Sequence, residues 1–282
     1  MIPTAIREYI RPTTVEEAWA VLAERGRAAR AVGGGIDVHL FRVQEASALV
    51  DLTSIDLAYV RVDGELAIGA TTTFTEILES AEGAAYLGGI LVEVLEQVAS
   101  PLQRNQGTIG GTIGSAHPWS DVIPLLLVLD AELTVYDGRE RRTPLARYLA
   151  ERSTGARPLI AEIRLPEAPQ GGRCAFEAFT TTGFDVAILN CAAYAVLDGE
   201  RCKVARVAVG GTPALARRLS AVEQMLVDAP LDEAAIERAT RTAAEAIDAR
   251  DDRRASAEYR RTLARVGVAR CLRRIAQQGG IE

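Results

Sequence analysis

The chain has 282 residues, of which 48% are hydrophobic and 25% charged, as expected for a globular protein of about two domains. Its formal net charge of −6 argues against a nucleic-acid partner, because such binding depends on Lys and Arg that neutralise phosphates. The sequence contains no uncharged apolar run of about 18 residues, so we expect no membrane span. The N-terminus lacks the basic and apolar segments of a secretory signal, so we expect a cytoplasmic protein.

The first predicted helix covers residues 13–25. Thr13 followed by Glu16 has the spacing of a capping box, and Gly26 ends the helix. Its apolar stripe consists of Val15, Ala18, Trp19 and Leu22. The text ARAVGGG, residues 29–35, predicts a short strand that runs into a glycine loop, followed by a helix and a second strand near residues 48–52.

The middle of the chain alternates between strand and helix signals. Residues 64–80 predict a strand, a turn and a helix that Thr73 and Glu76 begin with a capping box. An amphipathic helix is expected over 89–99, ending at Ser100-Pro101. A second glycine loop follows, and then residues 121–138 predict a buried helix, a strand and a turn. The stretch 159–166 predicts a strand that Pro166 ends.

Pro and Gly concentrate at 166–172, which makes this segment the predicted domain boundary. Two β-like stretches follow at 187–199 and 201–211, and the pattern is helical from Ser220 onward. We therefore expect an α+β protein with a first domain at 1–168, in sub-parts of about 1–54 and 55–168. A smaller second domain at 169–282 would pack an antiparallel sheet with helices.

The two glycine loops contain no Lys or Arg next to their glycines: one has GGG at 33–35, the other GTIGGTIG at 107–114. Glycine lets a ligand approach the main chain closely, and successive backbone N–H groups can hold an anion. Two such loops suit a pyrophosphate held from two sides. Each loop alone is weak evidence, because a GGG is more often a tight turn, and the Rossmann pattern G-x-G-x-x-G is absent.

The cysteines, Cys174, Cys191, Cys202 and Cys271, form no CxxC pair, and the chain has two histidines. We expect buried or half-buried free thiols and no metal site.

Longer motifs around the loops resemble the FAD-binding medium subunit of molybdenum hydroxylases, the family of aerobic carbon monoxide dehydrogenases and xanthine dehydrogenases. The family signature R-N-x-G-T-I-G-G-N is matched by residues 104–112, and P-x-S-D-x-x-P by residues 118–124. The family's first loop is matched by residues 33–38, and its C-terminal helix by the text SAEYRRTLARV from Ser256. The resemblance covers nearly the whole chain and implies a PCMH-type FAD-binding domain.

The resemblance also implies a set of cofactor-binding residues. Both loops would bind the FAD pyrophosphate through main-chain amides, Asp121 would hydrogen-bond ribose or ribityl hydroxyls, and Ile160 would lie near the adenine or flavin rings. The full set is Gly33, Gly34, Gly35, Ile36, Asp37, Val38, Thr108, Ile109, Gly110, Gly111, Thr112, Ser115, Asp121 and Ile160. No residue is expected to act as a catalytic acid or base.

Several residues depart from the family pattern. Ile36 replaces a usual Thr or Ser, and Thr112 replaces a usual Asn. Relatives carry Lys and Arg where this chain has Ala178, Thr181 and Thr182, and they commonly carry Tyr or Phe at the position of Val186. The resemblance places residues 178–186 near the flavin edge, so it implies FAD but does not identify the electron acceptor.

Other residues have plain structural interpretations. Asp37 could contact the cofactor or cap the following helix, and the two roles are compatible. His117 is more simply an exposed loop residue than a base, and His39 the start of a helix. Trp19 is expected in the core, whereas Trp119 could stack on a ring. The basic run at 258–275 alternates with Leu and Val, which favours a solvated helix face over a subunit interface.

The predicted function is electron transfer within a larger complex. By the resemblance, a large subunit carries the molybdenum cofactor, a small [2Fe-2S] subunit carries the clusters, and FAD on this chain delivers electrons to an external acceptor. The assembly would be a dimer of heterotrimers. One alternative is a non-redox nucleotide-binding scaffold with a degenerate FAD site, motivated by Ile36 and Thr112. A weaker one is a stand-alone flavin oxidase.

Overall fold

The computed structural model describes residues 6–40, 46–151 and 158–278, and the chain divides into two compact units. The first unit is made of Met1–Ala84, Ser100–Ser115 and Ala131–Pro166, and the second of Ala85–Ala99, Ala116–Asp130 and Glu167–Glu282. Two short segments before residue 131 therefore cluster with the C-terminal part of the chain. None of the described helices is long and apolar enough to span a membrane.

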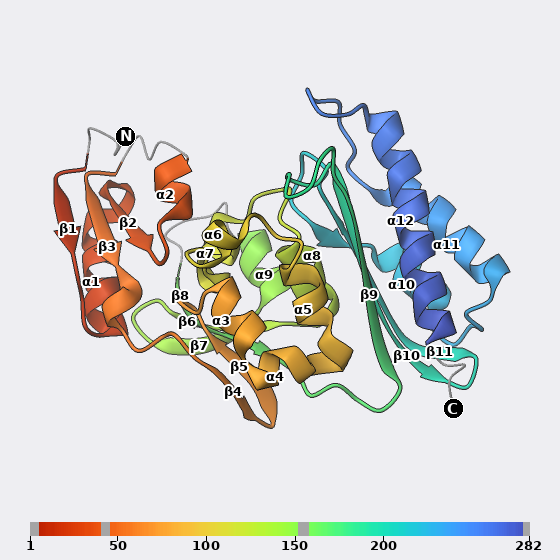
Figure 1. The fold of residues 1–282 in the computed structure, drawn as a ribbon, viewed down its shortest axis with the longest axis horizontal. Helices are drawn as coiled ribbons and strands as arrows, with labels where there is room; N and C mark the ends of the chain where they lie inside the picture. The colour runs from red at the N-terminus through yellow and green to blue at the C-terminus, as the bar shows by residue number, and fades with distance from the viewer. Residues whose placement is uncertain (1–5, 41–45, 152–157, 279–282) are drawn as a thin grey trace. The chain divides into compact units, whose positions relative to one another are not determined.

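The first unit begins with a small parallel sheet of order β1-β3-β2 (Figure 1). Its elements are β1 (Glu8–Ile10), α1 (Val15–Arg25), η1 (Gly26–Ala28), β2 (Ala29–Val32), α2 (Ile36–Leu40), β3 (Ala48–Asp51) and η2 (Leu52–Ser54). The predicted apolar stripe of α1 is confirmed: Ala18 is fully buried, and Val15, Trp19 and Leu22 pack against the same core. The predicted cap is wrong by one residue, because the Thr14 side chain accepts the hydrogen bond from the Glu17 amide. The sequence TTVEE contains two possible N-caps one residue apart, Thr13 with Glu16 and Thr14 with Glu17.

The rest of the first unit is built on an antiparallel sheet of order β4-β5-β8-β6-β7. Its strands are β4 (Val60–Asp63), β5 (Glu65–Gly69), β6 (Glu132–Tyr136), β7 (Glu140–Pro144) and β8 (Leu159–Leu165). The helices are α3 (Phe74–Glu79), α4 (Ala81–Ala85), α6 (Pro101–Arg104), α7 (Ile109–Ser115) and α9 (Leu145–Ala150). The capping box of Thr73 and Glu76 at α3 is confirmed.

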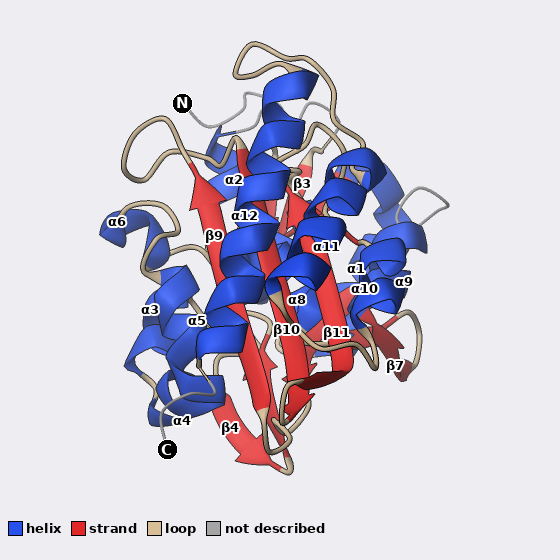
Figure 2. Ribbon diagram, turned by 90° about the vertical axis from the view of Figure 1, so that its right-hand side faces the viewer, coloured by secondary structure: helices blue, strands red, loops and turns tan. Residues whose placement is uncertain are grey.

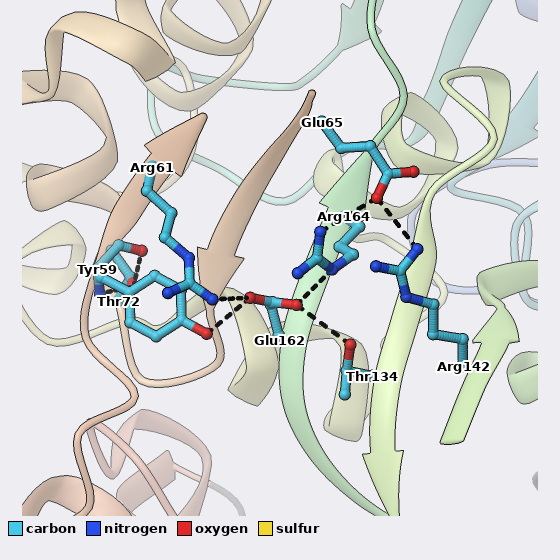
Figure 3. A network of polar contacts seen from close by, with 8 residues as sticks. All are labelled: Tyr59, Arg61, Glu65, Thr72, Thr134, Arg142, Glu162 and Arg164. Atoms are coloured by element: carbon cyan, nitrogen blue, oxygen red, sulfur yellow. Dashed lines mark hydrogen bonds and ion pairs between the residues drawn. The ribbon is translucent and has the colours of Figure 1, made fainter. Parts of the chain in front are cut away.

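One face of this sheet carries a buried carboxylate, Glu162 (Figure 3). It accepts hydrogen bonds from the Tyr59 hydroxyl (2.8 Å), Thr134 (3.2 Å) and Arg164 (2.6 Å), and Arg61 also pairs with it at 3.1 Å. Burial alone would raise the pKa of Glu162, but the hydrogen bond from Tyr59 and the charge of Arg164 outweigh it, so the pKa is lowered. This carboxylate is saturated by the protein itself.

The opposite face of the sheet is apolar, and a β-bulge decides where Ile160 lies. Thr134 pairs with Glu162 and Val135 with Ile160, so Ala161 has no partner on β6. Paired residues share a face, and successive residues of β6 alternate. Ile160 therefore lies with Val135 on the face opposite Glu162, and it is buried.

The second unit is an antiparallel sheet of order β12-β11-β10-β9 with helices on both faces. Its strands are β9 (Gly172–Phe179), β10 (Leu189–Asp198), β11 (Arg201–Gly210) and β12 (Arg217–Arg218). Its helical elements are η3 (Tyr86–Gly89), α5 (Ile90–Leu95), α8 (Val122–Val128), α10 (Ser220–Leu226), α11 (Glu233–Ala246) and α12 (Ala257–Gln277). Figure 2 shows α11 and α12 lying over the sheet, where alternate residues of β10 and β11 pack against them.

Several predicted helices and strands need correction. The helix expected over 89–99 ends at Leu95, and Ser100 instead begins α6 through a capping box with Gln103. Pro101 fits there because the first residue of a helix needs no amide partner. The strand β9 was not predicted. The buried helix expected after residue 121 and the two β-like stretches are confirmed as α8, β10 and β11.

The basic run of α12 is only partly a solvated face. Arg260 is 1% exposed and donates to the carbonyl oxygens of Ile188 (3.2 Å), Arg250 (2.6 Å) and Ala255 (2.9 Å) and to the Asp252 carboxylate (2.8 Å). The prediction of a solvated face is therefore wrong for Arg260, which links α12 to two loops. The four cysteines are confirmed as buried free thiols.

Candidate functional site

The two glycine motifs, residues 33–38 and 107–115, meet in the first unit. A Cβ atom on Gly34 would lie 1.4 Å from the carbonyl oxygen of Gln106, and one on Gly33 would lie 2.8 Å from Thr108 Oγ1. Only glycine allows the two backbones to approach this closely. The glycines of the first motif thus serve to join it to the second.

A side-chain hydrogen bond makes a second connection between the motifs. Gly35 has a φ of +77°, which turns the chain into α2 at Ile36. Asp37, in the first turn of α2, accepts a hydrogen bond from the Ser115 hydroxyl at the end of α7. The sequence alone did not indicate this link. Whether Asp37 also contacts the cofactor stays a prediction.

The second motif is mostly helix rather than loop. Its helix α7 begins at Ile109, and Thr108 Oγ1 accepts from the Gly111 amide at 3.1 Å, as an N-cap does. The amides of Ile109, Gly110 and Thr112 donate to the carbonyl oxygens of Thr72, Ala70 and Thr108. All four amides therefore already have partners in the chain, and whether they also contact a phosphate stays a prediction.

Backbone contacts connect the second motif to β8, where Ile160 lies. The Gly110 amide donates to the Ala70 carbonyl at 2.9 Å, and the Ala70 amide donates to the Ala161 carbonyl at 2.9 Å. A Cβ on Gly110 would lie 2.6 Å from the Ala70 oxygen, so this glycine is also needed for packing. Gly114 differs: a Cβ there would meet no atom within 4 Å.

Asp121 lies in the second unit, at the start of α8, yet its carboxylate does not cap that helix. Ser120 Oγ accepts from the Ile123 amide instead, at 3.4 Å. The carboxylate accepts a hydrogen bond from Asn190 Nδ2 at 2.7 Å, and the same nitrogen donates to the Ser120 carbonyl at 3.1 Å. Burial raises the pKa of Asp121 to about 6, and the hydrogen bond from Asn190 offsets only part of that rise.

His117 is not simply an exposed loop residue. It is half-buried, and its ring stacks on Trp119 with centroids 4.7 Å apart and planes 7° from parallel. The Arg254 guanidinium lies over the Trp119 ring, 5.3 Å from its centroid. The ring partner of Trp119 in this structure is therefore the neighbouring histidine. The side chain of His39 lies outside the described residues.

The centre of the stretch that departs from the family pattern is exposed, whereas Ala178 and Val186 are half-buried. Ala178 pairs with Asn190 across β9 and β10, while Thr181, Thr182 and the following residues form an exposed turn. Phe184 in this turn is 61% exposed and has a φ of 62°.

Sequence reasoning missed Asn190. A fully buried amide in the apolar strand text AILNCAAYAV is a signal that could have pointed to it.

The residues present fit FAD in two respects. The glycine motifs form a close junction of backbone without basic side chains, and Gly114 leaves open space beside it. Asp121 is a partly exposed carboxylate with few protein donors, so it can accept hydrogen bonds from ligand hydroxyls.

Comparison with known protein families agrees with this chemistry. The model of the FAD binding domain in molybdopterin dehydrogenase matches residues 4–168, and that of the CO dehydrogenase flavoprotein C-terminal domain matches residues 174–275. The chain belongs to this flavoprotein family. Its α+β fold, with an FAD-binding domain followed by an antiparallel sheet domain, is the predicted one, and FAD is its cofactor.

Individual members of the family match nearly the full length. The 6-hydroxypseudooxynicotine dehydrogenase complex subunit alpha of Paenarthrobacter nicotinovorans is 32% identical over 94% of this chain and 93% of that protein. The carbon monoxide dehydrogenase medium chain of Afipia carboxidovorans is 33% identical over 97% and 98%. A solved structure of carbon monoxide dehydrogenase from Hydrogenophaga pseudoflava superposes with a TM-score of 0.90 at 27% identity, covering 97% of this chain and 98% of that one. The chain is thus a flavoprotein subunit of a molybdenum-containing oxidoreductase.

Proposed function

We propose that this chain is the FAD-binding electron-transfer subunit of a multi-subunit molybdenum hydroxylase. It would receive electrons from the [2Fe-2S] clusters of a small partner subunit and pass them to an external acceptor. A large partner subunit would carry the molybdenum cofactor, and the assembly would be a dimer of heterotrimers. Bound FAD supplies the redox chemistry, because a flavin accepts single electrons and delivers a pair. The observation that carries the proposal is the junction of two glycine motifs in a chain of this family.

The chain's own residues would bind and orient the cofactor. We propose that the first motif, Gly33 to Val38, contacts the pyrophosphate through its backbone. The second motif would shape the same site by packing against the first, since the amides of residues 109–112 are already bonded. In this proposal the residues of the second motif that belong to the site are Thr108, Ile109, Gly110, Gly111 and Thr112. Ser115 belongs to it through the hydrogen bond that its hydroxyl donates to Asp37.

Two further residues are proposed to contact the cofactor. Asp121 would accept hydrogen bonds from ribose or ribityl hydroxyls, a role that suits a carboxylate kept away from phosphates. Ile160 would contribute an apolar surface for a ring system from the start of β8. No side chain is assigned a proton-transfer step.

The visible absorption spectrum of the chain co-expressed with its neighbouring subunits tests the proposal. We expect an oxidised flavin spectrum, release of FAD on denaturation, and bleaching by a reductant followed by recovery with an acceptor. A folded, assembled but colourless protein would favour the non-redox scaffold. Turnover of a small substrate by this chain without partners would favour a stand-alone oxidase.

A further inference from the structure

Asp121 is a carboxylate that the protein leaves short of partners. It does not cap α8, and within the described ranges no cation forms an ion pair with it. Its partner is Asn190 Nδ2, which bonds Oδ1 and leaves Oδ2 for another donor. A shielded carboxylate with one hydrogen bond is costly in its charged form, and added donors would favour that form.

Asn190 is fully buried in the middle of the sheet, and its side-chain amide donates hydrogen bonds to residues 120 and 121. Both of its near neighbours, the Ser120 carbonyl and the Asp121 carboxylate, are acceptors, so only the amide nitrogen can face them. The amide oxygen is buried and has no partner among the described residues. Such an oxygen lowers the stability of the fold. The side chain of Asn190 thus links β10 to residues 120 and 121.

Other charged groups near α8 are engaged elsewhere. On the strands that pack against it, Arg206 and Arg218 pair with Asp130, just beyond the opposite end of the helix. On the loop side, His117 stacks on the Trp119 ring, and the Arg254 guanidinium lies over the same ring. Asn190 is the side chain that donates a hydrogen bond to the Asp121 carboxylate.

We propose that Asn190 is a positioning residue for the cofactor: it holds the Asp121 carboxylate so that Oδ2 accepts a hydroxyl of the ribityl or ribose part, and binding is coupled to release of a proton from Asp121. This inference rests on the proposed function. Hydroxyl donors stabilise the charged carboxylate, so bound FAD lowers the pKa of Asp121 from its value of about 6 in the free chain. Below about pH 6 the free chain therefore carries more protons than the complex, and binding of FAD releases the difference. The affinity for FAD then rises with pH until pH reaches about 6.

The test is the dissociation constant of FAD from the full-length apo chain, measured by flavin fluorescence between pH 5 and pH 7.5. We expect wild-type binding to be about ten-fold weaker at pH 5 than at pH 7.5, because each pH unit below the pKa costs about a factor of ten. Asp121→Asn should bind weakly with no such dependence. Asn190→Leu should bind at least about five-fold more weakly at pH 7.5, with the midpoint of the profile moved to higher pH.

Two control variants show whether the pH profile belongs to the pair of Asn190 and Asp121. Asp130→Asn removes a carboxylate beyond the other end of α8 and should keep the wild-type midpoint. Asn190→Ser is the second variant if Asn190→Leu does not fold, as judged by circular dichroism, and should show an upward shift of smaller size. A folded Asn190 variant with the wild-type affinity and midpoint would overturn the inference while leaving the proposed function intact. A wild-type chain that binds no FAD at any pH would contradict both.

Discussion

The two units treat their shielded carboxylates in opposite ways. In the first unit, Glu162 has four protein donors and a lowered pKa. In the second, Asp121 has Asn190, and its pKa is raised to about 6. Burial raises the pKa of both side chains, so the difference comes from the number of donors and from the charge of Arg164. A saturated carboxylate stabilises its own fold, whereas an undersupplied one is available to a ligand.

The same contrast applies to the glycine motifs. In the first unit, Gly33, Gly34 and Gly110 are held against other backbone or side-chain atoms, and the amides of the second motif are bonded within the chain. The first unit therefore has a preformed junction that the chain itself maintains. In the second unit, the Asp121 carboxylate accepts a hydrogen bond from Asn190 on Oδ1.

The largest effect is expected at the glycine junction. Gly34→Ala places a Cβ 1.4 Å from the Gln106 oxygen, and this backbone cannot give way without separating the motifs. We expect a loss of at least about 3 kcal/mol in the free energy of unfolding, measured in urea, together with loss of bound flavin. A variant with wild-type stability would show that the motifs need not touch.

Removing the charge of the saturated carboxylate should also destabilise the chain. Glu162→Gln leaves Arg164 without a charged partner on β8, and we expect a loss of about 2–4 kcal/mol at pH 7. Because the folded pKa of Glu162 is lowered, its contribution is present above about pH 4 and is lost as pH falls through the folded value. Urea unfolding at pH 7 and pH 3 should show the two proteins converging at the lower pH.

The undersupplied carboxylate should respond with the opposite sign. Asp121→Asn is expected to stabilise the apo chain by about 1–3 kcal/mol at pH 7, since a pKa raised to about 6 makes ionisation costly in the folded state. Below about pH 4 Asp121 is protonated in both the folded and the unfolded chain, so it does not lower the free energy of unfolding. As pH rises from about 4 to about 6, the unfolded chain loses the proton more readily than the folded chain, and the wild type loses stability. Thermal unfolding across this range should show no difference at pH 4 and the full difference above pH 6. Equal stability at pH 7 would mean that Asp121 is well solvated.

The smallest effect is expected at the glycine that touches nothing. Gly114→Ala adds a methyl group inside α7 where no atom lies within 4 Å. We expect a gain of about 0.5–1 kcal/mol, because alanine favours the helix. It is the matched control for Gly34→Ala, and a marked loss of stability would show that α7 packs more tightly than its open side suggests.

Much of the fold could be predicted because its signals are local. The capping box at Thr73 and Glu76, the glycine after α1 and Pro166 after β8 all lie within a few residues of the structure that they specify. The errors were local ambiguities of the same kind: TTVEE allowed two caps, and Ser100-Pro101 was assigned to the end of one helix instead of the start of the next. The domain boundary near residue 168 and the list of cofactor-binding residues stay predictions.

The sequence by itself determined the family, the α+β class and the two glycine motifs, because motif text and hydrophobic period depend on neighbouring residues. Only the tertiary structure decided that the amides of residues 109–112 are occupied, that Arg260 is buried, and that Asn190 donates a hydrogen bond to Asp121. Asn190 and Asp121 are 69 positions apart. Contacts of that kind arise when strands and helices pack, and packing brings together residues whose separation along the chain carries no local signal.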